Sequence, residues 1–378
     1  MVMTSAIFFV SQACFVVLNV YLQVVLRNAG YSYVAIGFGM ALLELFGMVG
    51  PVVTGSFVDR HGHVRQSLGV LMALVSCAFF LIVHASWFFL PLLCCGVIGF
   101  CNKSQVSLQD ALALAKAEGN VDRYAHMRVM GTLGATFFSL LYGFLHVPDA
   151  SDSRSIFRLV LVVSLPYLLL CFFPHSHRNV MEVHAPKGEG SPWCTRSFVI
   201  CLVLVALSRL AMAGVQYMPL YMVDELGDDR VTLMYACATA SEFVAMLVSG
   251  KLIERHVLSP LSCMIISSCA IFVRMVLYAA FPSPLGVALA QATHSFCFGF
   301  FQPAVVLFVR RLVSPDHQGR GMGYMQSIGT GLMTMVGNLL CGFLVDVSGY
   351  RVMFLCCGAT ALASAVLFWA FRRCLSTT

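Results

Sequence analysis

The sequence predicts an all-α membrane protein in which twelve transmembrane helices form two six-helix halves. Of its 378 residues, 59% are hydrophobic and only 11% are charged, whereas soluble domains carry roughly 25% charged residues. Apolar stretches such as residues 197–223 are long enough to cross a bilayer as helices. Helices are the default in lipid because every backbone polar group must be paired within the protein. A short charged motif that occurs twice, about half the chain apart, indicates the two halves.

In chain order, the apolar runs between polar segments predict the individual spans. They lie near residues 5–26, 33–58, 66–84, 87–115, 126–147, 155–174, 197–223, 231–253, 260–281, 285–311, 319–345 and 350–371. The first run has no positively charged leader and no small-residue cleavage site, so we interpret it as a span and not as a signal peptide. The longest hydrophilic stretch, 175–196, separates an N-terminal half, 1–174, from a C-terminal half, 197–378.

The distribution of Lys and Arg predicts the orientation. Most of these residues outside the spans fall on one side, together with both termini and the 175–196 linker. Because positive loops face the cytoplasm, we expect a multi-pass protein of the cell membrane with both termini cytoplasmic. This bias explains the net charge of +6, and we expect no nucleic-acid partner.

Little sequence remains for an enzyme domain. The 16 Cys lie mostly inside the spans without metal-ligand spacing. We see no nucleophile–base pair, and we therefore expect no enzyme activity, no catalytic residue, no metal and no cofactor. We expect the chain to act as a monomer in the lipid bilayer.

The repeated motif reads GSFVDRH from Gly55 and GKLIERH from Gly250, each time at the predicted cytoplasmic end of a span. Glycine allows close helix approach, and an acid can accept hydrogen bonds from the N-terminus of a neighbouring helix. The motif therefore predicts a latch that forms in one state and breaks in another, although a charged helix end can simply mark the membrane boundary. The latch residues are Gly55, Asp59, Arg60, Gly250, Glu254 and Arg255.

The longer first copy, GSFVDRHGHVRQS, resembles the loop between the second and third helices of the major facilitator superfamily. The resemblance covers essentially the whole chain. It implies two six-helix halves that rock about a substrate site near the middle of the membrane.

Charged groups at membrane depth are expensive and are functional candidates by default. The predicted spans contain Glu44, Lys103, Asp110, Arg128, Arg209, Glu242, Arg274 and His294. Each could be a structural ion pair or could reach water from a helix end, but so many in one bundle favour pairing around a wet cavity.

Asp110 and Arg128 lie on successive spans joined by a short cytoplasmic turn, so we expect them at similar depth. Such a pair would offer hydrogen bonds to a polar substrate. Lys103 lies two helical turns before Asp110 on the same face, which makes it a further substrate-binding candidate.

Asp110 and Arg128, followed by VMGTLG, are similar to the acid, arginine and glycine motif of the lactose-permease-like branch. This branch contains proton symporters for oligosaccharides, and nucleoside and phenylpropionate permeases are similar. The resemblance implies that these two residues bind substrate. It also implies that Glu242, Arg274 and His294 couple substrate to protons. Three residues before His294, Gln291 stands where lactose permease has a Lys, and we expect Gln291 to be a further substrate-binding residue.

Besides Asp110 in place of a Glu and Gln291 in place of a Lys, two further departures limit this resemblance. The stacking Trp of the permease is replaced near Ala135, which argues against a galactoside, and its proton-carrying Glu is replaced by Cys297. Glu242 is then the best remaining proton carrier, followed by His294.

We therefore expect a secondary active transporter, with proton symport of a small polar organic solute as the leading interpretation. The alternatives are a proton-driven exporter of amphipathic compounds and a non-transporting membrane sensor on the same fold. At membrane depth, four fixed cations (Lys103, Arg128, Arg209, Arg274) face three acids (Glu44, Asp110, Glu242). The excess positive charge weakly favours an organic anion as the substrate.

Overall fold

The computed structural model describes residues 1–117, 121–172, 195–255, 257–313 and 318–376. The chain folds into two compact units. The first comprises Met1–Val183 and Met222–Ala236, and the second comprises His184–Tyr221 and Cys237–Thr378. The segment Met222–Ala236 thus joins the first unit, although it follows the predicted linker, 175–196, most of which lies outside the described residues.

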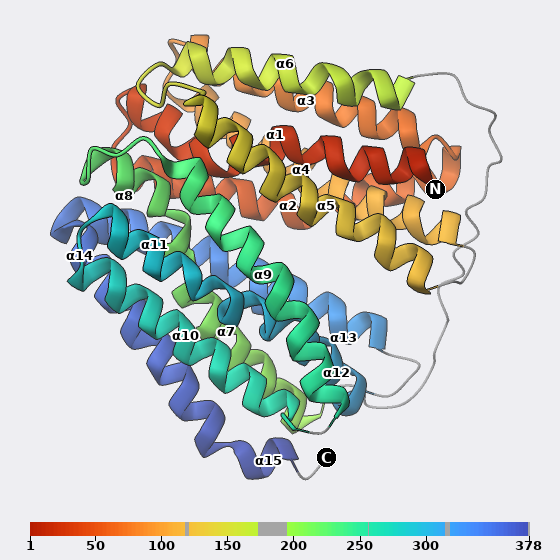
Figure 1. The fold of residues 1–378 in the computed structure, drawn as a ribbon, viewed down its shortest axis with the longest axis vertical. Coiled ribbons are helices and arrows are strands. Elements are labelled where there is room, and N and C mark those ends of the chain that lie inside the picture. The colour runs from red at the N-terminus through yellow and green to blue at the C-terminus, as the bar shows by residue number, and fades with distance from the viewer. Residues whose placement is uncertain (118–120, 173–194, 256, 314–317, 377–378) are drawn as a thin grey trace. The chain divides into compact units, whose positions relative to one another are not determined.

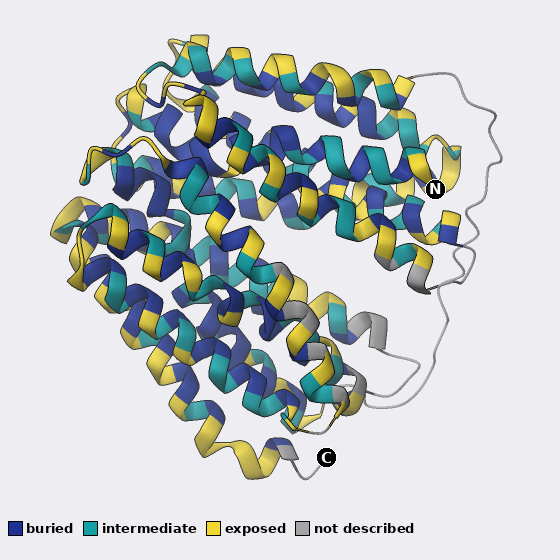
Figure 2. Cartoon of the chain, in the orientation of Figure 1, coloured by how far each residue is buried: buried dark blue, intermediate teal, exposed yellow. Residues whose placement is uncertain are grey.

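Six long helices build the first unit (Figure 1). They are α1 (Val2–Asn28), α2 (Tyr33–His61), α3 (Val64–His84), α4 (Phe89–Ala117), α5 (Val121–Leu145) and α6 (Ser153–Phe172). Helix α2 packs along α4, α1 packs against α5 and α6, and α3 packs against α4 and α6. Helix α1 is buried along most of its length, whereas α6 alternates between buried and exposed faces (Figure 2).

Several interrupted helices build the second unit. They are α7 (Arg196–Gln216), α8 (Met218–Asp224), α9 (Val231–Glu254), α10 (Pro260–Ala280), α11 (Pro284–Ala292), η1 (Ser295–Gly299), α12 (Phe301–Leu312), α13 (Gln318–Tyr324), η3 (Met325–Leu332), α14 (Met333–Ala370) and α15 (Arg372–Ser376). Helix α8 ends, and α9 begins, in the segment that belongs to the first unit. Segments η1 and η3 are π-helical.

These elements account for all twelve predicted spans. Helices α7 and α8 form the seventh span, α11 to α12 form the tenth, and α13, η3 and the start of α14 form the eleventh. The boundary between the eleventh and twelfth predicted spans lies within helix α14, where Gly349 interrupts the helix with a φ of 79° that favours glycine. Ten segments of the described chain are long and apolar enough to cross a membrane, and one of them, Gly321–Ala370, contains two predicted spans.

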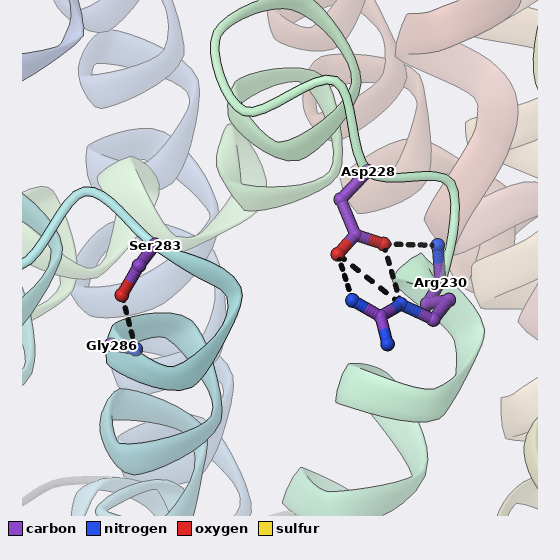
Figure 3. A network of polar contacts seen from close by, with 4 residues as sticks. All are labelled: Asp228, Arg230, Ser283 and Gly286. Atoms are coloured by element: carbon purple, nitrogen blue, oxygen red, sulfur yellow. Dashed lines mark hydrogen bonds and ion pairs between the residues drawn. The ribbon is translucent and has the colours of Figure 1, made fainter.

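Local sequence signals fix several helix ends. The hydroxyl of Ser32 accepts a hydrogen bond from the Ala35 amide at the start of α2, and Gly62 ends that helix with a φ of 71°. Ser283 caps α11 in the same way, accepting from the Gly286 amide at 3.1 Å just before Pro284 (Figure 3).

Glycines set the closest helix approach in the first unit, on the face shared by α2 and α4. A Cβ atom at Gly99 would collide with the Leu43 carbonyl, and one at Gly50 would collide with the Phe100 carbonyl. The apolar core of the second unit includes Phe198 on α7, Phe301 on α12 and Phe368 on α14. These cores hold the polar groups described next in fixed positions.

Candidate functional site

The first unit contains a cluster that we call the Asp110 cluster: Asp110 on α4 with Tyr124 and Arg128 on α5. Arg128 Nη1 lies 3.3 Å from Asp110 Oδ2 and donates to the Tyr124 hydroxyl at 2.7 Å. Tyr124 in turn donates to Asp110 Oδ1 at 3.2 Å. The expected pairing of Asp110 with Arg128 is confirmed. Because the Arg128 side chain is 57% exposed and uses one nitrogen for both contacts, the rest of its guanidinium can donate to another partner.

Lys103 has a different partner from the one that its spacing indicated. Its Nζ lies 3.6 Å from Glu44 Oε2, which joins α4 to α2. The Glu44 side chain is largely enclosed and the Lys103 side chain is half-exposed. This arrangement has the geometry of a structural ion pair, and it places Glu44 and Lys103 beside the glycine-lined contact of α2 and α4.

The second unit contains a more enclosed cluster, the Arg274 cluster, made of Glu242, Arg274, Tyr278, Gln291 and His294. Arg274 Nε donates to the Tyr278 hydroxyl at 3.0 Å, Nη1 lies 2.7 Å from His294 Nδ1, and Nη2 donates to Gln291 Oε1. On its other side, His294 Nε2 lies 3.3 Å from Glu242 Oε2. Helices α9, α10 and α11 and the start of η1 therefore meet through one chain of polar contacts.

The two neighbours of His294 define its tautomer. A guanidinium can only donate, so His294 Nδ1 must offer its lone pair to Arg274. A neutral imidazole then carries its proton on Nε2 and donates it to Glu242. Arg274 is 1% exposed, and its three nitrogens are all bonded within this cluster.

Arg209 on α7 is a second buried arginine among the described residues of the second unit. It is 3% exposed, its guanidinium carbon lies 3.6 Å from the centre of the Phe301 ring, and its Nε and Nη2 have no hydrogen-bond partner among the described residues. The sequence singled out Arg209 only as part of a charge count. Tyr124, Tyr278 and Phe301 were missed, because an aromatic residue in an apolar helix looks like core from sequence alone.

The structure describes the twin motif in part. Asp59 and Arg60 are exposed at the end of α2, and no hydrogen bond or ion pair joins them to another described residue. The close helix approach predicted at Gly55 is not found among the described residues, where a Cβ at Gly55 would meet no atom within 4 Å. The close approach occurs at Gly50 and Gly99 instead. The surroundings of Gly250 and of the Glu254 side chain lie outside what the structure describes, and Arg255 is exposed.

The segment Met222–Ala236 carries two further charge groups within the first unit. Asp224 Oδ2 lies 3.3 Å from Arg27 Nε and accepts from the Tyr33 hydroxyl at 3.0 Å. Farther along, Asp228 accepts from the backbone amide and the guanidinium of Arg230 (Figure 3). These hydrogen bonds from Arg230 lower the pKa of the Asp228 carboxyl below its usual value. Among the described residues, no group of three or more His, Cys, Asp or Glu side chains could hold a metal ion.

A family model and a curated relative both match most of this chain. The model of the MFS_1 like family matches residues 1–356. The maltose permease of Geobacillus stearothermophilus is 25% identical over 348 residues, which cover 90% of this chain and 85% of the permease.

Solved structures agree in fold. The nucleoside transporter NupG superposes with a TM-score of 0.79 at 15% identity, covering 98% of this chain and 98% of that one. The xylose transporter XylE from E. coli gives a TM-score of 0.70 at 12% identity over 98% and 97% of the two chains. The resemblance to the major facilitator superfamily and the expected helical fold are both confirmed.

Proposed function

This chain belongs to the MFS_1 like family of major facilitator transporters, and on that premise we propose that it moves a small polar organic solute by proton-coupled symport. The observation that supports this most is the contact of Glu242 with His294, which Arg274 orients from the other side. A carboxylate at membrane depth is energetically costly and is therefore a functional candidate by default. A carboxylate that contacts a histidine is suited to take up and release a proton.

Glu242 is the better proton carrier of the two titratable groups. With Arg274 donating to Nδ1, a second proton on His294 would break that hydrogen bond and place two positive charges 2.7 Å apart. A proton on the Glu242 carboxyl neither breaks the hydrogen bond between Arg274 and His294 nor places two positive charges together. Nε2 of His294 can still donate to the carboxyl oxygen that carries no proton. The proton cycle therefore runs on Glu242, and His294 transmits its state to Arg274.

We assign substrate binding to the Asp110 cluster. Arg128 keeps most of its guanidinium available while Asp110 and Tyr124 fix its position. A planar fork held in this way suits a ligand with two adjacent acceptor atoms. We propose a positioning role for Gln291, which accepts a hydrogen bond from Arg274, and a structural role for Lys103, which pairs with Glu44 outside both clusters.

The remaining assignments concern the membrane. The chain is a multi-pass membrane protein, and we place it in the cell membrane as a monomer with both termini cytoplasmic, following the bias of Lys and Arg. Asp59 and Arg60, with Arg255 from the second copy, then lie on the cytoplasmic side, where we propose that they act as a latch whose contacts change between states.

An uptake screen tests the function. The purified chain is reconstituted into liposomes and offered labelled maltose, a nucleoside, a dipeptide, xylose and small carboxylates, each with and without an inward proton gradient. We expect at least one solute to accumulate only with the gradient and to leave when an uncoupler is added. Accumulation that ignores the gradient would reject proton coupling, and proton-driven efflux of amphipathic dyes with no solute uptake would favour an exporter.

A further inference from the structure

Arg209 is a buried cation without a counter-charge among the described residues. Its Nε and Nη2 are enclosed and have no hydrogen-bond partner among the described residues. Each ion pair found between described residues involves groups other than Arg209. A guanidinium cannot be deprotonated in a protein, so Arg209 cannot become neutral as a buried Lys can. Leaving such a charge unpaired costs several kcal/mol.

Phe301 offsets part of this cost and fixes the side chain. A guanidinium stacked on an aromatic ring is stabilised by the ring's electrons, and more strongly when water is excluded. The Phe301 ring covers one face of the guanidinium at 3.6 Å, so this contact leaves the in-plane N–H groups of Nε and Nη2 without a hydrogen-bond partner among the described residues. Stacking explains how Arg209 is held, but it supplies no negative charge.

No spare acid lies near Arg209 in the part of the second unit that the structure describes. His294 and Cys297 are its titratable neighbours within electrostatic reach, and Glu242 is already paired with His294. Arg274, which is also buried in this unit, bonds described partners through all three of its nitrogens. Arg209, Arg274 and Glu242 together therefore carry one more positive charge than negative charge.

The geometry points to a carboxylate as the missing partner: we propose that Arg209 binds the carboxylate group of the transported solute, which makes the substrate an organic anion. The two unpaired nitrogens, Nε and Nη2, lie on the same edge of the guanidinium, and their N–H groups point side by side. This spacing matches the two oxygens of a carboxylate in a bidentate pair. The proposal rests on the proposed transport function and adds the charge of its substrate.

The test compares acids with their neutral amides. Binding of lactate against lactamide, benzoate against benzamide, and succinamate against succinamide is measured by thermal stabilisation of the full chain in detergent. We expect wild type to prefer at least one acid over its amide by about tenfold or more. Arg209→Gln should reduce that preference to within about twofold, and Arg209→Lys, which keeps the charge but loses the fork, should weaken acid binding about tenfold with amide binding unchanged.

Arg372→Gln is the matched control, because Arg372 is an exposed arginine that also stacks on an aromatic ring, Trp369, at 4.1 Å. It should leave the preference intact. Equal binding of every acid and amide by wild type would overturn the proposal, as would a preference for the acid that survives in Arg209→Gln. If the Gln variant does not fold, a preference in Arg209→Lys that is as large as in wild type would overturn it.

The same variants separate this proposal from the proposed function. If acid binding depends on Arg209 but no solute is taken up in response to the proton gradient, the carboxylate site is supported and proton symport is rejected. If a neutral solute is taken up in response to the proton gradient and this uptake is unchanged in Arg209→Gln, proton symport is supported and the carboxylate site is rejected.

Discussion

The Asp110 cluster and the Arg274 cluster use similar residues to different effect. Each contains an arginine, an acid and a tyrosine, yet Arg128 is 57% exposed and contacts its two partners through one nitrogen. Arg274 is 1% exposed and bonds three partners through three nitrogens. An arginine with spare donors can exchange a protein partner for a ligand, whereas a fully bonded one holds its neighbours in place. We therefore propose that Arg128 serves binding and that Arg274 serves positioning.

Arg274→Lys is expected to have the largest effect, because one ammonium cannot reach Tyr278, Gln291 and His294 together. Each buried polar group left without a partner costs roughly 1–3 kcal/mol. We expect a loss of stability of about 2 kcal/mol or more and no uphill transport, as measured by thermal unfolding in detergent and by uptake in liposomes. Wild-type stability in this variant would mean that the three hydrogen bonds do not hold the cluster together.

Arg128→Lys is the parallel change in the other cluster. Asp110 and Tyr124 can keep a charged partner, so stability should change by less than about 0.5 kcal/mol. Substrate binding should weaken at least tenfold, which is about 1.4 kcal/mol, because the planar fork is lost. Equilibrium binding with the substrate found in the uptake screen measures this. Near-normal binding would make Asp110 and Arg128 a structural salt bridge and remove the contrast between the clusters.

The contrast was partly predictable from sequence. The spans follow from apolar runs, and the Asp110–Arg128 pair follows from two helices joined by a short turn. The number of hydrogen-bond partners of each arginine was not predictable, because Tyr124, Tyr278 and Gln291 become partners only when particular helix faces meet. The π-helical segments Ser295–Gly299 and Met325–Leu332 were missed for the same reason, since their sequences have no local signal that distinguishes them from α-helix.

The glycines show the same limit. Gly55 was singled out because it belongs to a repeated motif, yet it faces open space, while the close contact falls at Gly50 and Gly99. Sequence repetition identifies a position that both halves share but does not say which neighbour it meets.

Asp59→Asn tests whether a charge outside both clusters affects the cycle. Asp59 is exposed in the described state, so its loss should leave substrate binding within about twofold and lower the transport rate severalfold by altering the exchange of states. Rate and binding are measured on the same preparation. An equal fall in both would place Asp59 with the binding residues and not with a latch.

The Asp228–Arg230 pair supplies the smallest expected effect and a reference for an acid–arginine pair with a local role. Arg230 lowers the pKa of Asp228 by hydrogen bonding, so the pair stabilises the fold above the pKa of the unfolded carboxyl. That contribution is lost as the pH falls through the folded value. Asp228→Asn should therefore reduce stability slightly at neutral pH and not at strongly acidic pH, with transport unchanged. A transport defect at neutral pH would show that this loop has more than a local role.

The most direct test of proton coupling through the Arg274 cluster is Glu242→Gln, measured by uphill uptake and by counterflow in the same liposomes. The amide imitates the protonated carboxyl permanently, while His294 keeps a hydrogen-bond acceptor. We predict that accumulation driven by an imposed proton gradient is abolished and that exchange of internal for external substrate remains largely intact. Accumulation by Glu242→Gln in response to the gradient would contradict the account and move the proton carrier to His294 or Asp110.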